Sequence, residues 1–415
     1  MNACGPMHRI SRWTAAGLAA GWVTFAGAAD GGAPAAADRA YGWRGDGSGV
    51  FPDATPPLAW SDTSNVAWKV AVGGGYSSPV VVGARVLVAS EPDQVVCLNV
   101  AEGKLLWSKT TTAADLPEAE RANVGDFYHD GTSGNAAATP ASDGTRAFMV
   151  FGNGLVTALD LKSGARVWLR HIATQPKSME GRSASPILAG GALLVHLTAL
   201  FALAPATGQI VWTQPTASDA YGTPVATRLG DVDVVVTPCG DLVRVADGKV
   251  LCSDIGMTKF SSPIVQRDIA CFGDDTCVAA QLPAVHTGRV ASAKELWTDN
   301  APGQIYSSPV LWHDRLYAVT GDGKLTVFDT KTRTHTEQTL DLAAGGGEAT
   351  VYASVTLAGK HLFVSDNQGV TAVLKADGEA TLVGLNRLSE GAGGTPAFAG
   401  SRIFVRAGES LYCLK

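Results

Sequence analysis

Three segments of the sequence share the same spacing of a small residue, a turn glycine and a tryptophan. They are CLNVAEGKLLW (97–107), ALDLKSGARVW (158–168) and ALAPATGQIVW (202–212). A site used once needs one copy, so a recurring segment indicates a joint between similar structural units. The glycine suits a tight turn between strands, and the tryptophan suits the wedge between neighbouring units. We therefore expect four tryptophans to dock one unit on the next: Trp68, Trp107, Trp168 and Trp212.

A second marker, a Ser/Thr-Pro step followed by a β-branched run, divides the chain into units of similar length. Successive markers are about 38 to 61 residues apart. That interval accommodates four short strands and their turns, which make one blade of a β-propeller. The eight copies are SSPVVV (77–82), ATPAS (138–142), ASPIL (184–188), GTPVA (222–226), SSPIV (261–265), SSPVL (307–311), the degenerate ASVTL (353–357) and GTPAF (394–398).

The eighth copy supplies only three strands before the sequence stops at Lys415. A fourth strand is available far upstream, where NVAWKVAV (65–72) precedes the first marker and carries Trp68. Pairing this strand with the last three closes the ring and removes exposed sheet edges. The predicted fold is therefore all-β: an eight-bladed β-propeller of four-stranded antiparallel blades over residues 65–415, closed by the N-terminal strand joining the last blade.

The first residues are typical of an export signal. Arg9 and Arg12 precede a short apolar stretch, WTAAGLAAGWVTFAGA (13–28), which ends in small residues. This pattern predicts a signal peptide over residues 1–29, cleaved near Ala28 or Ala29, followed by a leader over 30–64. The apolar stretch is short for a membrane span, and no later segment is long enough. We expect a periplasmic or secreted protein, monomeric, with no transmembrane segment in the mature chain.

Charge and cysteine usage narrow the possible partners. The formal net charge of −6 argues against a nucleic-acid partner, which requires a clustered positive field. The cysteine spacings lack the paired form of a zinc site, and we predict no metal site. In an oxidising compartment, Cys271 and Cys277 could face each other across a hairpin, so a disulfide between them is predicted. Cys97 and Cys413 occupy the position of a small packed side chain and are expected to be buried free thiols.

At this point the chain resembles the PQQ-repeat propellers, over roughly residues 43–415. Their docking motif, Ala-x-Asp-x-x-x-Gly-x-x-x-Trp, is matched by Ala158, Asp160, Gly164 and Trp168. The opening YGWRGDGSGVFPDATPPLAW (41–60) is similar to an exported branch of that family. The resemblance implies one of two functions. Quinoprotein alcohol dehydrogenases hold pyrroloquinoline quinone (PQQ) with calcium, whereas BamB-type proteins of outer-membrane assembly bind partners without a cofactor.

The dehydrogenases clamp their quinone between a tryptophan and a disulfide of two adjacent cysteines, and this sequence has no Cys-Cys pair. We therefore predict a non-catalytic scaffold that binds a protein partner in the cell envelope or a small ligand, with no cofactor and no catalytic residue. BamB-like envelope assembly is one version of this function. The alternative is a PQQ-dependent oxidoreductase with calcium.

Two features are candidates for recognition. The first is the position three residues before each marker proline, or before Val355, where the innermost strand of each blade begins. Aromatic residues there would gather at one mouth of the channel and stack on a planar ligand, a sugar or a peptide side chain. The alternative is that each packs under its own blade. Five of the eight residues are aromatic: Tyr76, Tyr221, Phe260, Tyr306 and Tyr352, with Ala137, Ser183 and Gly393 completing the set.

The second candidate is the longest connection, residues 110–137. Connections of this length in compact folds are either functional or disordered. Its second half contains residue types that can coordinate a cation or hydrogen-bond a partner. The alternative is an acidic, mobile surface loop. The candidate residues are Asp126, Tyr128, His129 and Asp130.

Overall fold

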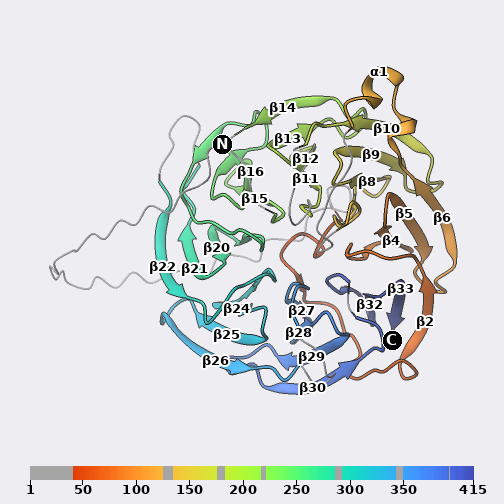
Figure 1. Ribbon diagram of the computed structural model, residues 1–415. Coiled ribbons are helices and arrows are strands. Elements are labelled where there is room, and N and C mark those ends of the chain that lie inside the picture. The colour runs from red at the N-terminus through yellow and green to blue at the C-terminus, as the bar shows by residue number, and fades with distance from the viewer. Residues whose placement is uncertain are drawn as a thin grey trace. The chain divides into compact units, whose positions relative to one another are not determined.

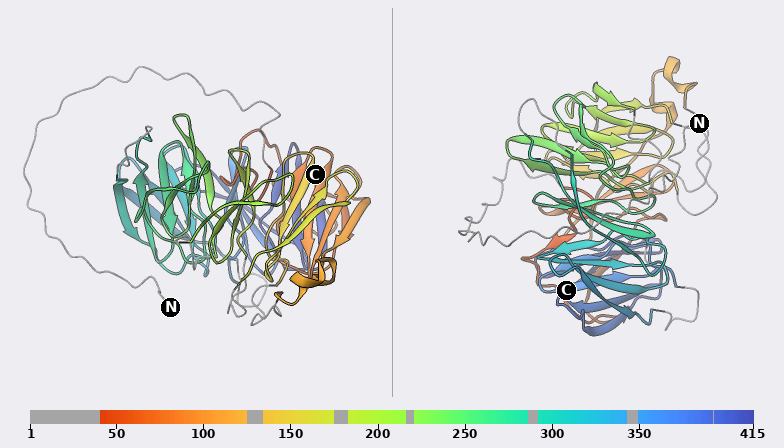
Figure 2. Two further views of the ribbon diagram at one scale, coloured as in Figure 1. Left: turned by 90° about the horizontal axis from the view of Figure 1, so that it is seen from above. Right: turned by 90° about the vertical axis from the view of Figure 1, so that its left-hand side faces the viewer.

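Eight sheets are arranged side by side around a central axis (Figure 1). The structure, a computed structural model, describes residues 41–124, 134–174, 183–215, 221–285, 292–342, 349–391 and 393–415. In each sheet four strands pair antiparallel with their neighbours in order from the axis outwards. The predicted eight-bladed propeller is confirmed. Edge views show the blades side by side around the ring (Figure 2).

The first four blades each contain four consecutive strands. Blade 1 holds β3 (Val80–Val82), β4 (Arg85–Ser90), β5 (Gln94–Asn99) and β6 (Leu105–Thr110). Blade 2 holds β7 (Ala141–Ser142), β8 (Arg146–Val150), β9 (Leu155–Asp160) and β10 (Arg166–His171). Blade 3 holds β11 (Ile187–Ala189), β12 (Ala192–His196), β13 (Leu200–Leu203) and β14 (Ile210–Gln214). Blade 4 holds β15 (Val225–Leu229), β16 (Val232–Val236), β17 (Leu242–Arg244) and β18 (Val250–Cys252).

The remaining blades follow the same plan. Blade 5 holds β19 (Ile264–Gln266), β20 (Ile269–Gly273), β21 (Thr276–Gln281) and β22 (Lys294–Asn300). Blade 6 holds β23 (Val310–Trp312), β24 (Arg315–Val319), β25 (Lys324–Asp329) and β26 (Thr334–Thr339). Blade 7 holds β27 (Thr356–Ala358), β28 (His361–Ser365), β29 (Val370–Lys375) and β30 (Leu382–Arg387). Blade 8 holds β31 (Ala397–Ala399), β32 (Arg402–Ala407), β33 (Ser410–Leu414) and the distant β2 (Val66–Ala71). The helices that the described ranges contain are short: the 3₁₀ turn η2 (Ala113–Asp115) and α1 (Glu118–Arg121).

The ring closes as the sequence predicts. Strand β2 pairs antiparallel with β33, and Trp68 lies opposite Cys413 in the register. Because β2 pairs with β33, it completes the last blade and joins the two ends of the ring. Closed propellers avoid exposed sheet edges in this way. Cys97 and Cys413 are buried free thiols, as predicted.

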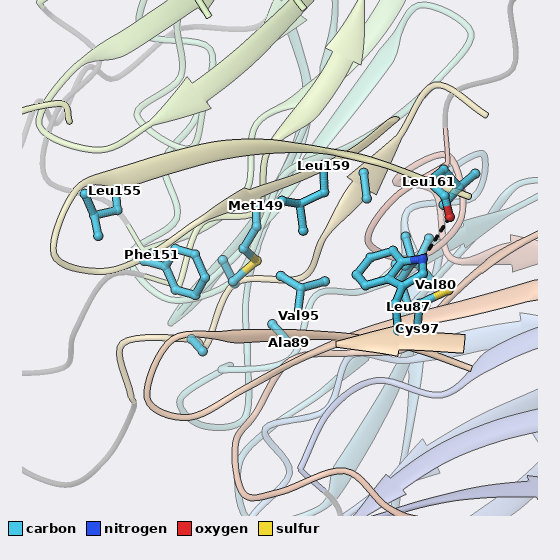
Figure 3. Close-up of a cluster of buried hydrophobic side chains, with 14 of the residues drawn as sticks. Val80, Leu87, Ala89, Val95, Cys97, Met149, Phe151, Leu155, Leu159 and Leu161 are labelled. Carbon is cyan, nitrogen blue, oxygen red and sulfur yellow. Dashed lines mark hydrogen bonds between the residues drawn. The ribbon is translucent and has the colours of Figure 1, made fainter. Parts of the chain in front are cut away.

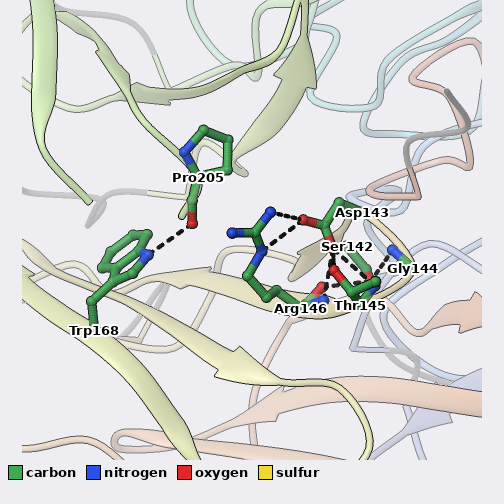
Figure 4. Close-up of polar contacts among 7 residues, drawn as sticks. All are labelled: Ser142, Asp143, Gly144, Thr145, Arg146, Trp168 and Pro205. Atoms are coloured by element: carbon green, nitrogen blue, oxygen red, sulfur yellow. Dashed lines mark hydrogen bonds and ion pairs between the residues drawn. The ribbon is translucent and has the colours of Figure 1, made fainter. Parts of the chain in front are cut away.

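The four docking tryptophans lie between consecutive blades. Each indole Nε1 donates a hydrogen bond to a backbone carbonyl of the next blade at 2.8–3.0 Å. Figure 4 shows the bond from Trp168 to Pro205. Figure 3 shows the apolar side chains packed between blades 1 and 2. The ring of Trp107 lies so close to Gly164 that an added Cβ would approach it to 2.7 Å. The recurring glycine therefore provides space for the preceding blade's tryptophan as well as a turn.

The described part of the predicted leader packs on the propeller. Strand β1 (Val50–Phe51) runs parallel to β27 and adds a fifth strand to blade 7. Ala54 and Trp60, further along the leader, are buried. The predicted signal peptide, residues 1–29, and the rest of the leader up to residue 40 lie outside the described residues.

The predicted disulfide is absent. Cys271 and Cys277 are both buried free thiols on the paired strands β20 and β21. Cys271 lies opposite Ala279, and Cys277 lies opposite Gly273. The two cysteines are therefore diagonal neighbours, with Cα atoms roughly 7–8 Å apart in such an arrangement. That separation exceeds the usual reach of a disulfide.

Candidate binding site in the central channel

The residue before each marker proline, or before Val355, forms a closed ring around the channel. Every one of these residues is a serine or threonine and is buried. The backbone N–H of each donates to the side-chain hydroxyl oxygen of its counterpart in the next blade, at 2.8–3.0 Å. We call this set the hydroxyl ring. Its members are Ser78, Thr139, Ser185, Thr223, Ser262, Ser308, Ser354 and Thr395.

Two residues before the hydroxyl ring, the predicted aromatic positions come together. Tyr221 and Phe260 stack with ring centroids 5.8 Å apart and planes 11° apart. Phe260 contacts Tyr306 at 5.1 Å, and Tyr306 contacts Tyr352 at 5.3 Å. These four rings, from four consecutive blades, form a continuous strip that we call the aromatic arc. Tyr76 belongs to blade 1, four blades away from Phe260 in a ring of eight, and therefore faces the arc across the mouth.

The N-terminal segment runs across the centre of the ring (Figure 1). Tyr41 bridges to Ser142 in blade 2, and Val50 pairs with Leu357 in blade 7. These contacts involve residues three positions after the hydroxyl ring, whereas the aromatic arc lies two positions before it. Because the innermost strands run along the channel, the segment and the arc lie at opposite ends.

Arg44 holds this crossing segment in place. It is buried, and its Nη2 donates to the carbonyl oxygens of Pro309 at 2.7 Å and Val355 at 2.8 Å. Burial lowers the pKa of Arg44 to about 9. Its guanidinium carbon lies 5.2 Å from the ring centroid of Trp43. Trp43 in turn lines the channel.

These parts enclose one cavity of about 810 Å³. All eight members of the hydroxyl ring line it, as do all eight residues of the predicted mouth column, with Trp43 at the far end. Among the described lining residues none is Asp, Glu, Lys, Arg or His. The cavity therefore combines aromatic faces and hydroxyl groups without a charged side chain.

The side of the mouth between Tyr352 and Tyr76 is lined by glycines. Two of them, Gly75 and Gly393, lie against the side chain of Arg406, so a Cβ there would meet it at 3.2–3.3 Å. Arg406 is fully buried and donates to the carbonyl oxygens of Gly73 and Ala89 and to Ser90 Oγ. Burial lowers the pKa of Arg406 to about 10. This arginine joins blade 8 to blade 1 beside the mouth.

The sequence interpretation missed several of these residues. The Ser/Thr of the marker was visible in all eight copies, including the degenerate one, but its role as a hydrogen-bonded ring was not inferred. Trp43, Arg44 and Arg406 belong to no repeat, so periodicity provides no signal for them. The loop candidates Asp126, Tyr128, His129 and Asp130 lie outside the described residues.

The cavity residues do not fit PQQ with calcium. Calcium in proteins is bound by six to eight oxygen ligands that usually include carboxylates, and the described lining provides no carboxylate. Within the described ranges, no group of three or more His, Cys, Asp or Glu residues is placed to hold a metal ion.

Comparison with known families agrees with the repeat pattern. A family model described as outer membrane protein assembly factor BamB matches residues 58–290 and 242–414. Together these ranges span most of the propeller. The chain belongs to this PQQ-repeat family. Membership of the family fixes the architecture and leaves the partner open.

Individual relatives are more distant. Outer membrane protein assembly factor BamB of Alkalilimnicola ehrlichii is 27% identical over 176 residues, which cover 36% of this chain and 43% of that protein. The match thus spans less than half of the relative's length. The crystal structure of BamB from Moraxella catarrhalis has a TM-score of 0.59 at 14% identity, covering 84% of this chain and 99% of that one. Quinohemoprotein alcohol dehydrogenase from Comamonas testosteroni gives 0.58 at 10%, covering 84% and 76%. Both structural similarities demonstrate the fold alone.

No helix in the described parts of the chain has the length and apolar character needed to cross a membrane.

Proposed function

We propose that the chain is a non-catalytic binding scaffold of the cell envelope and that the aromatic arc is its contact surface for a protein partner. The observation that carries this proposal is the exposure of the mouth. Tyr352 of the arc is 56% exposed, and Tyr76 across the mouth is 47% exposed. Side chains that served only to pack a blade would be buried. Tyrosine is one of the residue types enriched among the few positions that dominate the binding energy of an interface.

The chemistry of the cavity supports binding in preference to catalysis. General acid–base or nucleophilic catalysis requires titratable or activated groups within reach of a substrate. The described lining contains no carboxylate, imidazole, amine or thiol. Rigid aromatic and hydroxyl groups on a closed ring are suited to holding a partner in one geometry.

The envelope location rests on the export signal expected over residues 1–29 and on the BamB family match. A chain of this kind is expected to act in the periplasm or after secretion, as a monomer. By analogy with the family, its partner would belong to the assembly of outer-membrane proteins.

Site-specific photocrosslinking in intact cells tests the proposal. A benzophenone amino acid at Tyr352 should capture a protein partner, whereas the same group at Leu105, an exposed residue of the outermost strand β6, should not. Tyr306→Ala introduced with the Tyr352 crosslinker should reduce capture. Equal capture at Tyr352 and Leu105, or no capture at either, would overturn the assignment of the mouth.

Titration with PQQ and calcium tests the oxidoreductase alternative. We expect no saturable change in absorbance and no alcohol- or sugar-dependent dye reduction. Saturable quinone uptake with turnover would replace the scaffold proposal with a redox function.

A further inference from the structure

We infer that the channel behind the aromatic arc is a binding site for a neutral saccharide, with sugar ring faces on the aromatic side chains and sugar hydroxyls on the hydroxyl ring. This inference rests on the proposed function only in taking the mouth as the entrance. It assigns a ligand to the interior of the channel. A protein partner could contact the rim of the mouth without such a ligand.

The first argument concerns the free hydrogen-bonding capacity of the hydroxyl ring. Each oxygen accepts one backbone N–H from the preceding blade. A hydroxyl has one donor and two acceptor lone pairs, so each retains its O–H and one lone pair. Among the described residues these O–H groups donate no hydrogen bond to the protein. The wall therefore presents eight groups that can both donate and accept, as the hydroxyls of a sugar do.

The second argument concerns charge. An ionic ligand would lose its hydration in a cavity whose described lining includes no charged side chain, which is strongly unfavourable. Lys259, whose Nζ lies 4.6 Å from the Phe260 ring centroid, and the buried Arg44 are not among the lining residues. A wholly apolar ligand would displace water from the hydroxyl ring and leave those groups unpaired. A neutral sugar has apolar ring faces and many hydroxyls, so it matches both parts of the cavity.

The third argument concerns the placement of the aromatic rings. The arc occupies one side of the mouth, with Tyr221 and Phe260 nearly parallel, and Tyr76 stands on the opposite side. Its neighbours in the column are small: Gly393 in blade 8 and Ala137 in blade 2. A ring-shaped ligand can therefore enter between two aromatic surfaces without meeting a complete collar of side chains.

The fourth argument concerns depth. The cavity of about 810 Å³ falls in the range of small-molecule sites. Trp43 lines its far end, and the bonds of Arg44 to Pro309 and Val355 fix the segment that carries it. Trp43 thus provides a further aromatic surface for the innermost sugar.

Isothermal titration calorimetry on the chain lacking residues 1–29 tests the inference, with cellobiose, maltose and chitobiose as neutral probes and glucose against glucuronic acid as the charge comparison. We expect saturable binding of at least one disaccharide with a dissociation constant below about 1 mM. Tyr306→Ala should weaken it about tenfold or more, and Tyr306→Phe should restore it. Leu105→Ala, on the outer face, is the control and should change nothing.

Thr223→Val tests the hydroxyl ring directly, provided that circular dichroism shows a folded protein, and should also weaken binding. If this variant does not fold, the Tyr306 pair still decides the question. Absence of saturable binding for all neutral probes would overturn the inference, and retained crosslinking at Tyr352 would leave the scaffold function standing. Tighter binding of glucuronic acid than of glucose would also overturn it, because Nε and Nη1 of Arg44 lack hydrogen-bond partners among the described residues and would then be the anchor.

Discussion

The backbone N–H of Thr395 donates to Ser78 Oγ at 3.0 Å, joining residues 317 positions apart in the sequence. This bond is the last of the eight in the hydroxyl ring, and it connects blade 8 to blade 1 independently of the pairing between β2 and β33. The two ends of the ring are therefore joined near the axis as well as at the outer edge.

Ser78→Ala tests this junction. Removal of the hydroxyl leaves the buried Thr395 N–H without its acceptor, which costs about 1–3 kcal/mol. Ser78→Thr should restore most of the free energy of unfolding, because threonine already occupies three of the eight ring positions: Thr139, Thr223 and Thr395. Urea denaturation of the three proteins provides the comparison. An alanine variant as stable as the parent would mean that the bond does not contribute.

The glycine beneath each docking tryptophan gives a second prediction. Gly164→Ala introduces a Cβ at 2.7 Å from the Trp107 ring in a residue with φ of +71°. Gly83→Ala is a matched control, since its φ is +57° and nothing lies within 4 Å of the added atom. Gly164→Ala should lower the free energy of unfolding by about 1–3 kcal/mol more than Gly83→Ala, through overpacking. Equal losses would show that backbone strain alone accounts for both.

Thiol reactivity tests the absence of the disulfide. Cys271 and Cys277 are buried free thiols, and burial raises the pKa of Cys277 to about 12. Both should resist iodoacetamide at pH 8 in the folded protein, because the reactive thiolate is suppressed. Cys239 is only partly buried and should be labelled first. Peptide mapping by mass spectrometry before and after unfolding identifies the sites. A peptide pair that becomes alkylated only after reduction would establish the disulfide instead.

A buried carboxylate gives a pH-dependent prediction. Burial raises the pKa of Asp366, and its Oδ2 has no hydrogen-bond partner among the described residues. A raised folded-state pKa means that the contribution of Asp366 to stability is present below its unfolded pKa and is lost as pH rises through the folded value.

The free energy of unfolding of Asp366→Asn, measured relative to that of the parent, should therefore be highest at pH 7. This difference should shift in favour of the parent as the pH falls toward 4. Urea denaturation of both proteins at several pH values measures the difference, in which shared acid effects cancel. A difference in the free energy of unfolding that does not change with pH would contradict the burial argument.

The architecture was predictable because packing residues recur with the blades. The tryptophans and the glycines beneath them, such as Trp107 and Gly164, define the joints, and the Ser/Thr-Pro marker defines the blade starts. Closure by the strand around Trp68 followed from counting strands. The column of Tyr221, Phe260 and Tyr306 could be placed at the mouth for the same reason.

Other features depend on information that periodicity does not contain. Ser78 donates to Thr139, which lies one blade away along a connection of variable length, and it accepts from Thr395, which lies near the other end of the chain. Neither partner can be identified from the repeat spacing. Trp43 and Arg44 occur once, in a segment without repeats. The pairing of Cys271 with Ala279 depends on strand register, which a turn of uncertain length does not specify.

The hydrogen bonds of the hydroxyl ring all run in one rotational direction, from each blade to its successor. An extra or missing whole blade could preserve this pattern only if the remaining blades changed their spacing around the axis, because every donor needs an acceptor at one fixed angular step. Blade number is thus coupled to the hydrogen bonds next to the axis, which are made by residues that also line the channel. Duplication or loss of one repeat would change the width of the channel and the number of hydroxyl groups that line it at the same time.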